Sequence, residues 1–570
     1  MEKNNFSGLD WSLVQSPGLT SGAKEIQGLA EDISRRLAVF YYKEQMPCFW
    51  VVFVGGTGTG KSTIFNAFCG KTLSETGVER PKTFGPILYA HQGAFIETDF
   101  PLPSIQVERH TAGAFHSGPA TGTAGRLLVL EHDEDELSHL AVVDTPDLDS
   151  VERENSEIAE DLSLLADAVV FVTSQEKYAD EVPYRFFLRI TGATKPYFFL
   201  LNKADDQLVE EEVIDTLKGQ GIALQRNRVW TIPYAPSQPG QWISEYSAFR
   251  DFVRVLSEEF SITRLEGLRK EFALRRASGL KTDLGRLQDI LAEENRAVRE
   301  WRNKLDALFQ ETSEGLIREQ REGFRADNRE YIQREIRKLF TKYDVLAKPR
   351  RFIRELFATT FGLLGFRKED SHENHKDALL KVRQKTDLTP VQRAIQRLNR
   401  LVLERLSPAD ETSPLFLRLR EAGRAVKDEE IKERVWKEHD LLDEWLEQTF
   451  QKLAQELPRH KKWGIYSTSA LWGVLILSFE VVAGGGFTVL DAVIDSVLGP
   501  FVTKGTVELF AYHEIRKIAR ELARRYQSGL VSVVREQRDR YEQALSSLVT
   551  PRETLESLQA LRSNIGNPGL

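Results

Sequence analysis

The stretch FWVVFVGGTGTGKSTIFNAF, residues 49–68, decides the fold of the N-terminal half. Its first six residues form a continuous apolar run, which is typical of a strand buried on both faces of a sheet. The glycine-rich loop that follows satisfies the pattern GxxxxGK(S/T), and a helical pattern begins directly after it. Because glycines permit positive backbone torsions, successive amides can point inward and bind an anion at the N-terminus of the next helix. The stretch therefore predicts a site for a nucleoside triphosphate, without specifying the base.

Phosphate contacts are expected from the whole loop and the first turn of the helix. These residues are Gly55, Gly56, Thr57, Gly58, Thr59, Gly60, Lys61, Ser62 and Thr63. Lys61 is placed to reach the β- and γ-phosphate oxygens and to contribute to catalysis, and the Ser62 hydroxyl is placed to ligate Mg²⁺. The alternative is a glycine-rich turn that matches the pattern by chance, which the flanking strand and helix argue against.

Further apolar runs extend the predicted sheet outward from this strand. They are LAVVD (140–144), AVVFV (168–172), YFFLLN (197–202) and VWTI (229–232), with additional strands and loops expected in 84–135. Runs of this kind alternating with helical patterns predict an α/β domain with a mostly parallel sheet and helices on both faces.

Two short motifs follow these strands and favour guanine. Asp144 begins DTPD, and a carboxylate at this strand end can hold Mg²⁺, usually through a water. Asn202, Lys203 and Asp205 belong to NKAD (202–205), which begins at the end of the run YFFLLN. Asp205 can accept hydrogen bonds from the N1 and N2 donors of guanine, which adenine lacks, while Asn202 and the Lys203 stem hold the loop and cover the base.

These elements, in this order, resemble the Ras-like, translation-factor-related class of GTPases over about residues 46–262. The segment ERPKT (79–83) is similar to switch I of dynamin-like GTPases, including mitofusin and bacterial dynamin-like proteins. The resemblance implies that the Thr83 hydroxyl ligates Mg²⁺ and that its amide senses the γ-phosphate, which makes Thr83 a second catalytic residue. The alternative is an ordinary loop threonine after a proline turn.

Departures from the family pattern predict slow hydrolysis. Asp147 stands where family members have glycine, and its carboxylate is unfavourable near a γ-phosphate unless it points away. Leu148 stands where Ras-like enzymes have a water-orienting glutamine. Thr57 and Gly58 replace the Gln and Ser of dynamin, and potassium-activated GTPases have Asn at the Gly58 position. Turnover is therefore expected to rely on positioning, Lys61, Mg²⁺ and a group contributed by a partner.

The chain has 570 residues, of which 41% are hydrophobic, so two or three domains are expected. After about Ser261 the composition becomes dense in Arg, Glu, Leu and Gln, which predicts an elongated all-helical bundle. The predicted parts are an N-terminal lead-in and helix (1–45), the GTPase domain (46–262), a helical bundle or stalk (263–460), an apolar hairpin (461–504) and C-terminal helices that return to the bundle (505–570).

The apolar hairpin has two interpretations. Residues 464–479 carry no charge, but sixteen residues fall short of the ~20 that span a bilayer as one helix. Gly484-Gly485-Gly486 then permits a reversal into a second apolar helix. Residues 464–503 either contact membrane lipid or form the central hairpin of the bundle core.

Composition limits the remaining function classes. A formal charge of −8 gives no electrostatic reason to expect nucleic-acid binding, and two cysteines and an N-terminus without an apolar signal fit a cytoplasmic protein. The architecture resembles bacterial dynamin-like GTPases, which implies GTP/GDP and Mg²⁺ as cofactors, a homodimer or homo-oligomer through G domains, and a peripheral or hairpin-anchored location at the cytoplasmic face of a membrane. The alternatives are a soluble regulatory or assembly GTPase whose helices bind a protein or ribosomal partner, and a nucleotide-binding scaffold with negligible hydrolysis.

Overall fold

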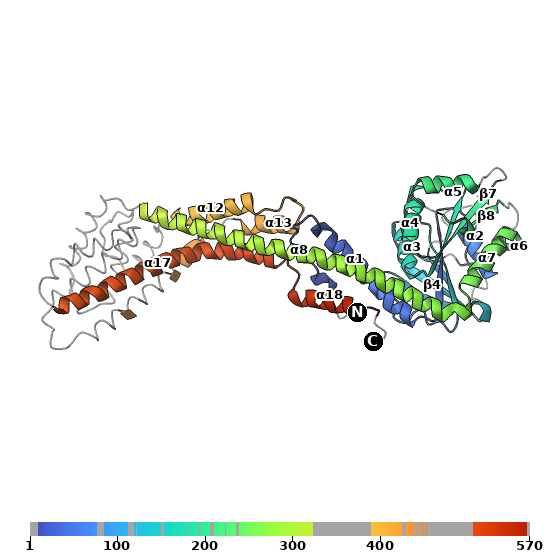
Figure 1. Cartoon of the computed structure of the whole chain (residues 1–570), viewed down its shortest axis with the longest axis horizontal. Helices are drawn as coiled ribbons and strands as arrows, with labels where there is room; N and C mark the ends of the chain where they lie inside the picture. The colour runs from blue at the N-terminus through green and yellow to red at the C-terminus, as the bar shows by residue number, and fades with distance from the viewer. Residues whose placement is uncertain are drawn as a thin grey trace, which may run out of the picture. The chain divides into compact units, whose positions relative to one another are not determined.

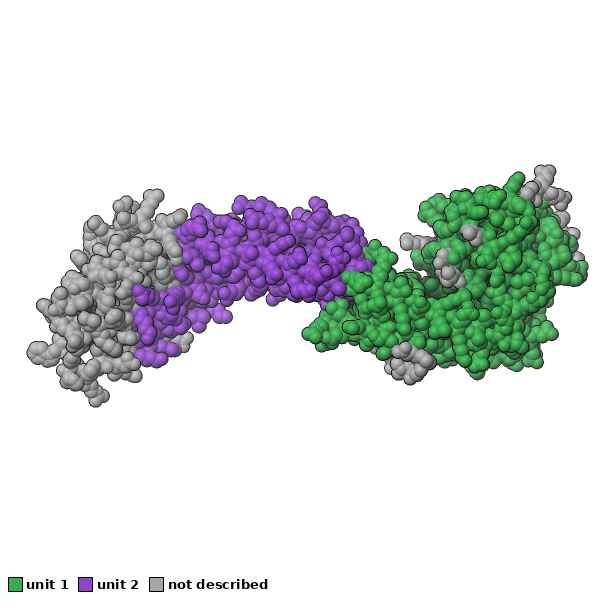
Figure 2. Space-filling model, viewed as in Figure 1, with its two compact units in different colours: residues 1–14, 25–289, 551–570 green, residues 15–24, 290–550 purple. Residues whose placement is uncertain are grey.

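The structure, a computed structural model, divides into two compact units, which Figure 2 distinguishes by colour. The first unit comprises residues 1–14, 25–289 and 551–570, and the second comprises 15–24 and 290–550. The residues described are 9–76, 85–111, 119–120, 122–149, 153–178, 180–192, 195–205, 210–222, 224–234, 239–322, 389–424, 429–435, parts of 437–452, and 506–566. Thr83 and the predicted hairpin 464–503 lie outside them.

The first unit is built on an eight-stranded sheet. Its strands are β1 (Phe49–Gly55), β2 (Ile87–His91), β3 (Gln106–Thr111), β4 (Arg126–His132), β5 (Leu140–Asp144), β6 (Ala168–Ser174), β7 (Tyr197–Ala204) and β8 (Val229–Pro233). Their order is β3-β4-β2-β5-β1-β6-β7-β8. The β2–β5 pair is antiparallel and the other neighbouring pairs are parallel. The mostly parallel sheet and the predicted strands are confirmed.

Helices cover both faces of this sheet (Figure 1). One face carries α2 (Lys61–Cys69), α6 (Pro239–Glu245) and α7 (Ser247–Glu259), and the other carries α3 (Arg153–Leu165), α4 (Glu181–Gly192) and α5 (Glu210–Gly219). Alternate residues of β1 serve the two cores: Val51 packs on the α2 side and Val52 on the α3 side, and both are fully buried. This double burial is why the strand is an uninterrupted apolar run.

The strand order fixes where a ligand can bind. β1 lies between β5 and β6, so the chain leaves β1 toward one side of the sheet and later returns to the other. In open α/β sheets, ligands bind beyond the carboxyl ends of the strands at such a switch point. The glycine-rich loop follows β1 at this place.

Three helical segments complete the first unit. They are α1 (Ala23–Gln45), the first part of α8 (Leu265–Glu322) and α18 (Arg552–Asn564). Arg286 of α8 forms an ion pair with Glu25 of α1, and Arg562 of α18 donates to Gln288 of α8 over 3.0 Å. Helices at the start, middle and end of the chain therefore contact one another.

The second unit contains the rest of α8 with α12 (Thr389–Arg405), α13 (Pro414–Ala422) and α17 (Thr506–Ser546). Trp301, Leu398 and Tyr541, from three of these helices, are buried in one core. The long helical region predicted after the α/β domain is confirmed. Within the described ranges, no helix combines the length and the apolar character that crossing a bilayer requires.

Candidate functional site

The loop between β1 and α2 has the backbone of an anion-binding cradle. Gly58 and Gly60 have positive φ angles of 72° and 89°, a region that side chains disfavour. A Cβ on Gly60 would also lie 2.2 Å from the Asn202 side-chain nitrogen. Glycine is therefore required at position 60 for both torsion and space, and the amides of a glycine-rich turn that opens a helix fit a bound phosphate chain.

Two residues of the NKAD motif hold this loop from the end of β7. The buried Asn202 donates from Nδ2 to the Thr59 carbonyl over 2.8 Å, and Lys203 donates from Nζ to the Gly58 carbonyl over 2.7 Å. Lys203 itself has a φ of 57°, beside a bulge between β7 and β8. The structure thus brings together two motifs that are separated by more than a hundred residues in the sequence.

Lys61 begins α2 and is buried at the centre of the site. Its Nζ lies 2.9 Å from Asp144 Oδ1 and 3.8 Å from Asp147 Oδ1, and it also donates to the Thr145 carbonyl. Burial has the largest effect on the pKa of Lys61 and lowers it, but attraction to Asp144 and Asp147 outweighs burial and leaves the pKa raised. Lys61 is therefore a fixed cation at the carboxyl end of β1.

Asp147 does not point away from the site, which the sequence left open. Its carboxylate faces the same ammonium as Asp144 and is partly exposed. A negative charge here opposes the approach of a γ-phosphate.

Asp144 is fully buried at the end of β5 and both of its oxygens are engaged. Oδ1 contacts Lys61, and Oδ2 accepts from the Ser74 hydroxyl over 2.8 Å. Asn66 positions Ser74 by accepting from its amide over 2.9 Å. Ser62 and Asp144 offer the hard oxygen ligands that Mg²⁺ prefers, so these residues fit the ion. Sequence reasoning missed Ser74, which no motif marks.

Asp149 is a second carboxylate that sequence reasoning missed. Its Oδ1 accepts from the Thr57 amide over 2.5 Å and from the Thr57 hydroxyl over 2.7 Å, while Lys177 Nζ lies 3.3 Å from Oδ2. Partial burial raises the pKa of Asp149, but the Thr57 hydrogen bonds and Lys177 outweigh it and hold the pKa below its usual value. The signal was present in the sequence, because Asp149 lies two residues after the DTPD motif.

Asp205 is exposed and is oriented by Gln175, another residue missed from the sequence. The Asp205 amide donates to Gln175 Oε1 over 3.0 Å, and Gln175 Nε2 donates to Asp205 Oδ2 over 3.1 Å. Gln175 directly follows β6, and Asp205 follows β7. Because the two strands are parallel neighbours, the residues after their carboxyl ends lie at the same edge of the sheet, which could have indicated Gln175. The exposed carboxylate suits a base that binds from solvent.

The structure collects the predicted residues at one edge of the sheet. The glycine-rich loop (55–60), Lys61, Asp144 and the NKAD residues 202–205 lie at the carboxyl ends of β1, β5 and β7, and Ser62 and Thr63 lie in the first turn of α2. Their roles stay predictions.

No protein-family model matches the chain. A protein of Caldicellulosiruptor sp. (strain Rt8B.4), described as an uncharacterized protein in the xynA 3' region, is 25% identical over 185 residues, which are 31% of this chain and 45% of that protein. This chain therefore matches less than half the length of that relative.

Two solved structures are similar along nearly the whole chain. Both are described as an oligomerised bacterial dynamin pair that provides a mechanism for long-range sensing and tethering of membranes. One has 13% identity and a TM-score of 0.39, covering 99% of this chain and 96% of its own; the other has 12% and 0.38, covering 100% and 96%.

Proposed function

We propose that this chain is a dynamin-like GTPase that binds GTP with Mg²⁺, hydrolyses it to GDP and phosphate, and acts at a membrane. Residues 46–262 would form the GTPase domain. The observation that supports nucleotide binding best is the direct bonding of Asn202 and Lys203 to the carbonyls of the glycine-rich loop. Asp205 follows these two residues in the chain and is exposed, which supports a nucleotide that engages both the loop and the Asp205 carboxylate.

Different side chains have different roles in the proposed hydrolysis. Lys61 supplies a fixed cation to the β- and γ-phosphates, and the loop amides donate to the phosphate oxygens. Ser62 and Asp144, with Thr83 as a further proposed ligand, would hold Mg²⁺, which would supply neutralisation of negative charge at these oxygens. Thr57 is hydrogen-bonded to Asp149 and occupies the position where dynamin has glutamine. We therefore propose that the group that orients the attacking water comes from a second copy of the chain, which associates through the G domains.

The membrane part of the proposal rests on the sequence of 464–503. Residues 464–479 are uncharged, and Lys461 and Lys462 precede them, a pattern that favours contact with anionic headgroups. A soluble GTPase whose helices bind a protein partner is the competing outcome of the membrane test given in the Discussion.

Nucleotide choice tests the first part of the proposal. Calorimetry should show that the chain binds GTP more tightly than ATP. Asp205→Asn should weaken GTP binding and improve binding of xanthosine triphosphate, because the amide presents a donor where the guanine edge also presents one. Asp215→Asn makes the same charge change on the exposed face of α5 and should leave both affinities unchanged. A wild-type preference for ATP would refute the assignment.

Turnover tests the second part. Lys61→Ala should abolish hydrolysis, because the γ-phosphate loses its nearest fixed cation. Specific activity of the wild type should rise with protein concentration if a second copy completes the site. A flat specific activity over a wide concentration range would contradict this dependence on a second copy.

A further inference from the structure

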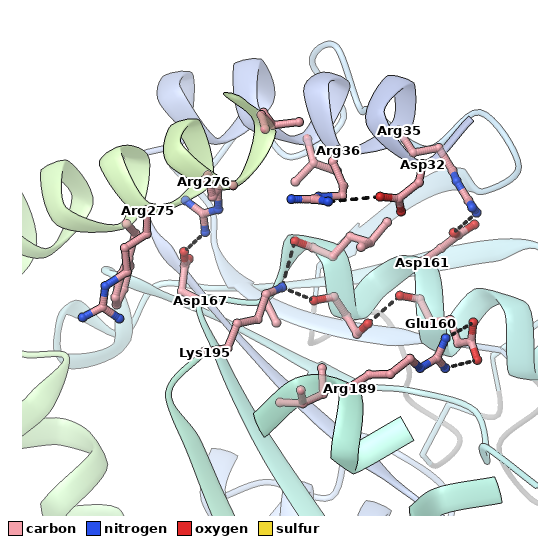
Figure 3. Close-up of a pocket in the computed structure, with 18 of the residues that line it drawn as sticks. Asp32, Arg35, Arg36, Glu160, Asp161, Asp167, Arg189, Lys195, Arg275 and Arg276 are labelled. Atoms are coloured by element: carbon pink, nitrogen blue, oxygen red, sulfur yellow. Dashed lines mark hydrogen bonds and ion pairs between the residues drawn. The ribbon is translucent and has the colours of Figure 1, made fainter. Parts of the chain in front are cut away.

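A cavity of about 820 Å³ lies in the first unit, away from the proposed nucleotide site. Its walls include Asp167 and Lys195, which precede β6 and β7. The nucleotide residues of the same two parallel strands lie at the opposite, carboxyl ends. Residues of α1, α3, α4 and α8 complete the walls, and Figure 3 shows the charged ones. The cavity is thus separated from the nucleotide site by the length of the strands.

Basic side chains outnumber acidic ones in this cavity. Arg35, Arg36, Arg189, Lys195, Arg275 and Arg276 line it together with Asp32, Glu160, Asp161 and Asp167. Most of the guanidinium groups are firmly paired: Arg36 lies 2.6 Å from Asp283, and Arg276 is paired with the buried Asp167. Arg35, Arg189 and Arg275 are paired with Asp161, Glu160 and Glu271 in the same way, so among the basic residues of the wall Lys195 differs in having no carboxylate in an ion pair with it in the described residues.

Lys195 is held by backbone carbonyls. Its ammonium donates to the carbonyls of Ser163 over 2.8 Å and Leu164 over 3.3 Å, at the C-terminal end of α3. No carboxylate lies within ion-pair distance of Nζ in the part of the chain that is described. Since an ammonium has three N–H donors, one remains beyond these two bonds. The third donor is available to a ligand in the cavity, into which Lys195 projects (Figure 3).

The surroundings of Lys195 disfavour the charged form of its side chain and lower its pKa. Burial is the largest cause that lowers its pKa, Arg276 is the next, and Lys43 and Arg36 add to it, while Asp167 acts in the opposite direction. Together they lower the pKa of Lys195 to about 7. An anion bound beside it would relieve the repulsion and favour the charged form.

Arg35 provides a second group that an anion can recruit. Its guanidinium lies 3.4 Å from Asp161 and is about half exposed, at 54%. The Asp161 side chain is only 16% exposed and also accepts from the Ser104 hydroxyl over 3.3 Å, so it keeps a partner when the guanidinium turns toward a ligand. The volume falls within the range of about 300–1,000 Å³ that is usual for small-molecule sites.

We propose that this cavity binds a small phosphate monoester, with Lys195 and Arg35 as its cationic contacts. An ammonium and a guanidinium fork together suit a dianion with three equivalent oxygens. The phosphate monoester comes either from a soluble metabolite or from a lipid headgroup. The site shares no residue with the proposed nucleotide site.

Calorimetry on the full chain tests this proposal with two probes. The probes are sn-glycerol 3-phosphate and vesicles of phosphatidylcholine with or without phosphatidic acid, whose headgroup is also a phosphate monoester. Saturating GDP and Mg²⁺ prevent the probes from binding to the glycine-rich loop. If GDP itself gives no heat of binding, the proposed GTPase function is contradicted, and this result is distinct from the result for the cavity. Binding of glycerol 3-phosphate identifies a soluble ligand, and binding only to phosphatidic acid vesicles identifies a lipid headgroup.

Variants locate the binding. Lys195→Gln should weaken binding at least about ten-fold, whereas Lys195→Arg should retain most of it. Lys218→Gln, on the exposed last turn of α5, is the matched control and should have no effect. If Lys195→Gln fails to fold, Arg35→Gln replaces it, with several-fold weaker binding expected. Equal affinity of the folded variant and the wild type would overturn the proposal, as would the absence of binding to either probe.

Proton uptake gives a readout that a merely structural role of Lys195 would not move. Titration near pH 8 in buffers of different ionisation enthalpy should show uptake of roughly one proton per bound ligand, because the amine becomes charged on binding. Lys195→Gln should show none. Wild-type binding without proton uptake would contradict a role for the ammonium.

Discussion

The side-chain nitrogen of Asn202 lies 2.8 Å from the Thr59 carbonyl, so the end of β7 is bonded directly to the loop that follows β1. Between them passes the backbone of Gly60, whose missing side chain leaves the space that Asn202 occupies. The hydrogen bond is buried, so no water replaces it if it is lost. This contact links the residues proposed to read the base with those proposed to hold the phosphates.

Asn202→Ala should weaken nucleotide binding and destabilise the first unit by about 1–3 kcal/mol, because the buried Thr59 carbonyl loses its donor. Calorimetry with GTP and chemical denaturation measure the two effects. Asn227→Ala, at an exposed position before β8, should change neither. Unchanged GTP affinity in Asn202→Ala would show that the loop is held without this bond.

Asp147→Asn should bind GTP more tightly relative to GDP. The substitution removes a carboxylate that lies 3.8 Å from Lys61 and repels a γ-phosphate. Because Asp147 is partly exposed, the gain should be about 1 kcal/mol, or roughly five-fold in the GTP to GDP affinity ratio. Competition between the two nucleotides measures it. An unchanged ratio would mean that Asp147 turns away once nucleotide binds.

Asp167→Asn should destabilise the first unit. The buried carboxylate pairs with Lys43 of α1 and Arg276 of α8 and accepts from the Trp50 amide over 2.8 Å, so its loss leaves a buried ammonium uncompensated. The expected loss is about 3–5 kcal/mol at neutral pH, measured by denaturant unfolding.

This loss should depend on pH. Burial raises the pKa of Asp167, but Lys43 and Arg276 outweigh burial and hold the pKa below its usual value. The stabilisation is therefore present above the unfolded pKa of about 4 and disappears as the pH falls through the lower folded value. The difference between wild type and Asp167→Asn should shrink over that range. Asp161→Asn is the control, because burial raises the pKa of Asp161, and it should not show this loss on acidification.

Leu475→Asp separates the two interpretations of the apolar hairpin. If residues 464–479 contact lipid, the variant should leave membranes in flotation yet stay folded and bind GTP, because each apolar side chain withdrawn from water contributes ~1.5–3 kcal/mol. If these residues form the bundle core, the buried charge should lower the melting temperature and cause aggregation. Melting and flotation on the same protein decide between them.

The sequence by itself determined the α/β domain and the loop at its centre. β1 is buried on both faces, so its residues had to be apolar without interruption, and the same holds for the strands of 140–144, 168–172 and 197–202. The glycine-rich loop has a pattern because few residues tolerate its torsions. The composition after Ser261, dense in Arg, Glu, Leu and Gln, likewise predicted long helices, and α8 and α17 are such helices.

Tertiary structure alone decided which residues complete the site. Ser74 has no pattern of its own, and Asp149 and Gln175 are marked only by following a motif or a strand. All three matter because folding brings them to Asp144, Thr57 and Asp205. The direction of Asp147 depends on where Lys61 lies, which no local rule specifies. The pairing of α1 with α8 and the cavity beside it also join residues more than a hundred positions apart. Local sequence fixes torsion and burial, whereas charge pairing and cavities depend on elements that meet only after folding.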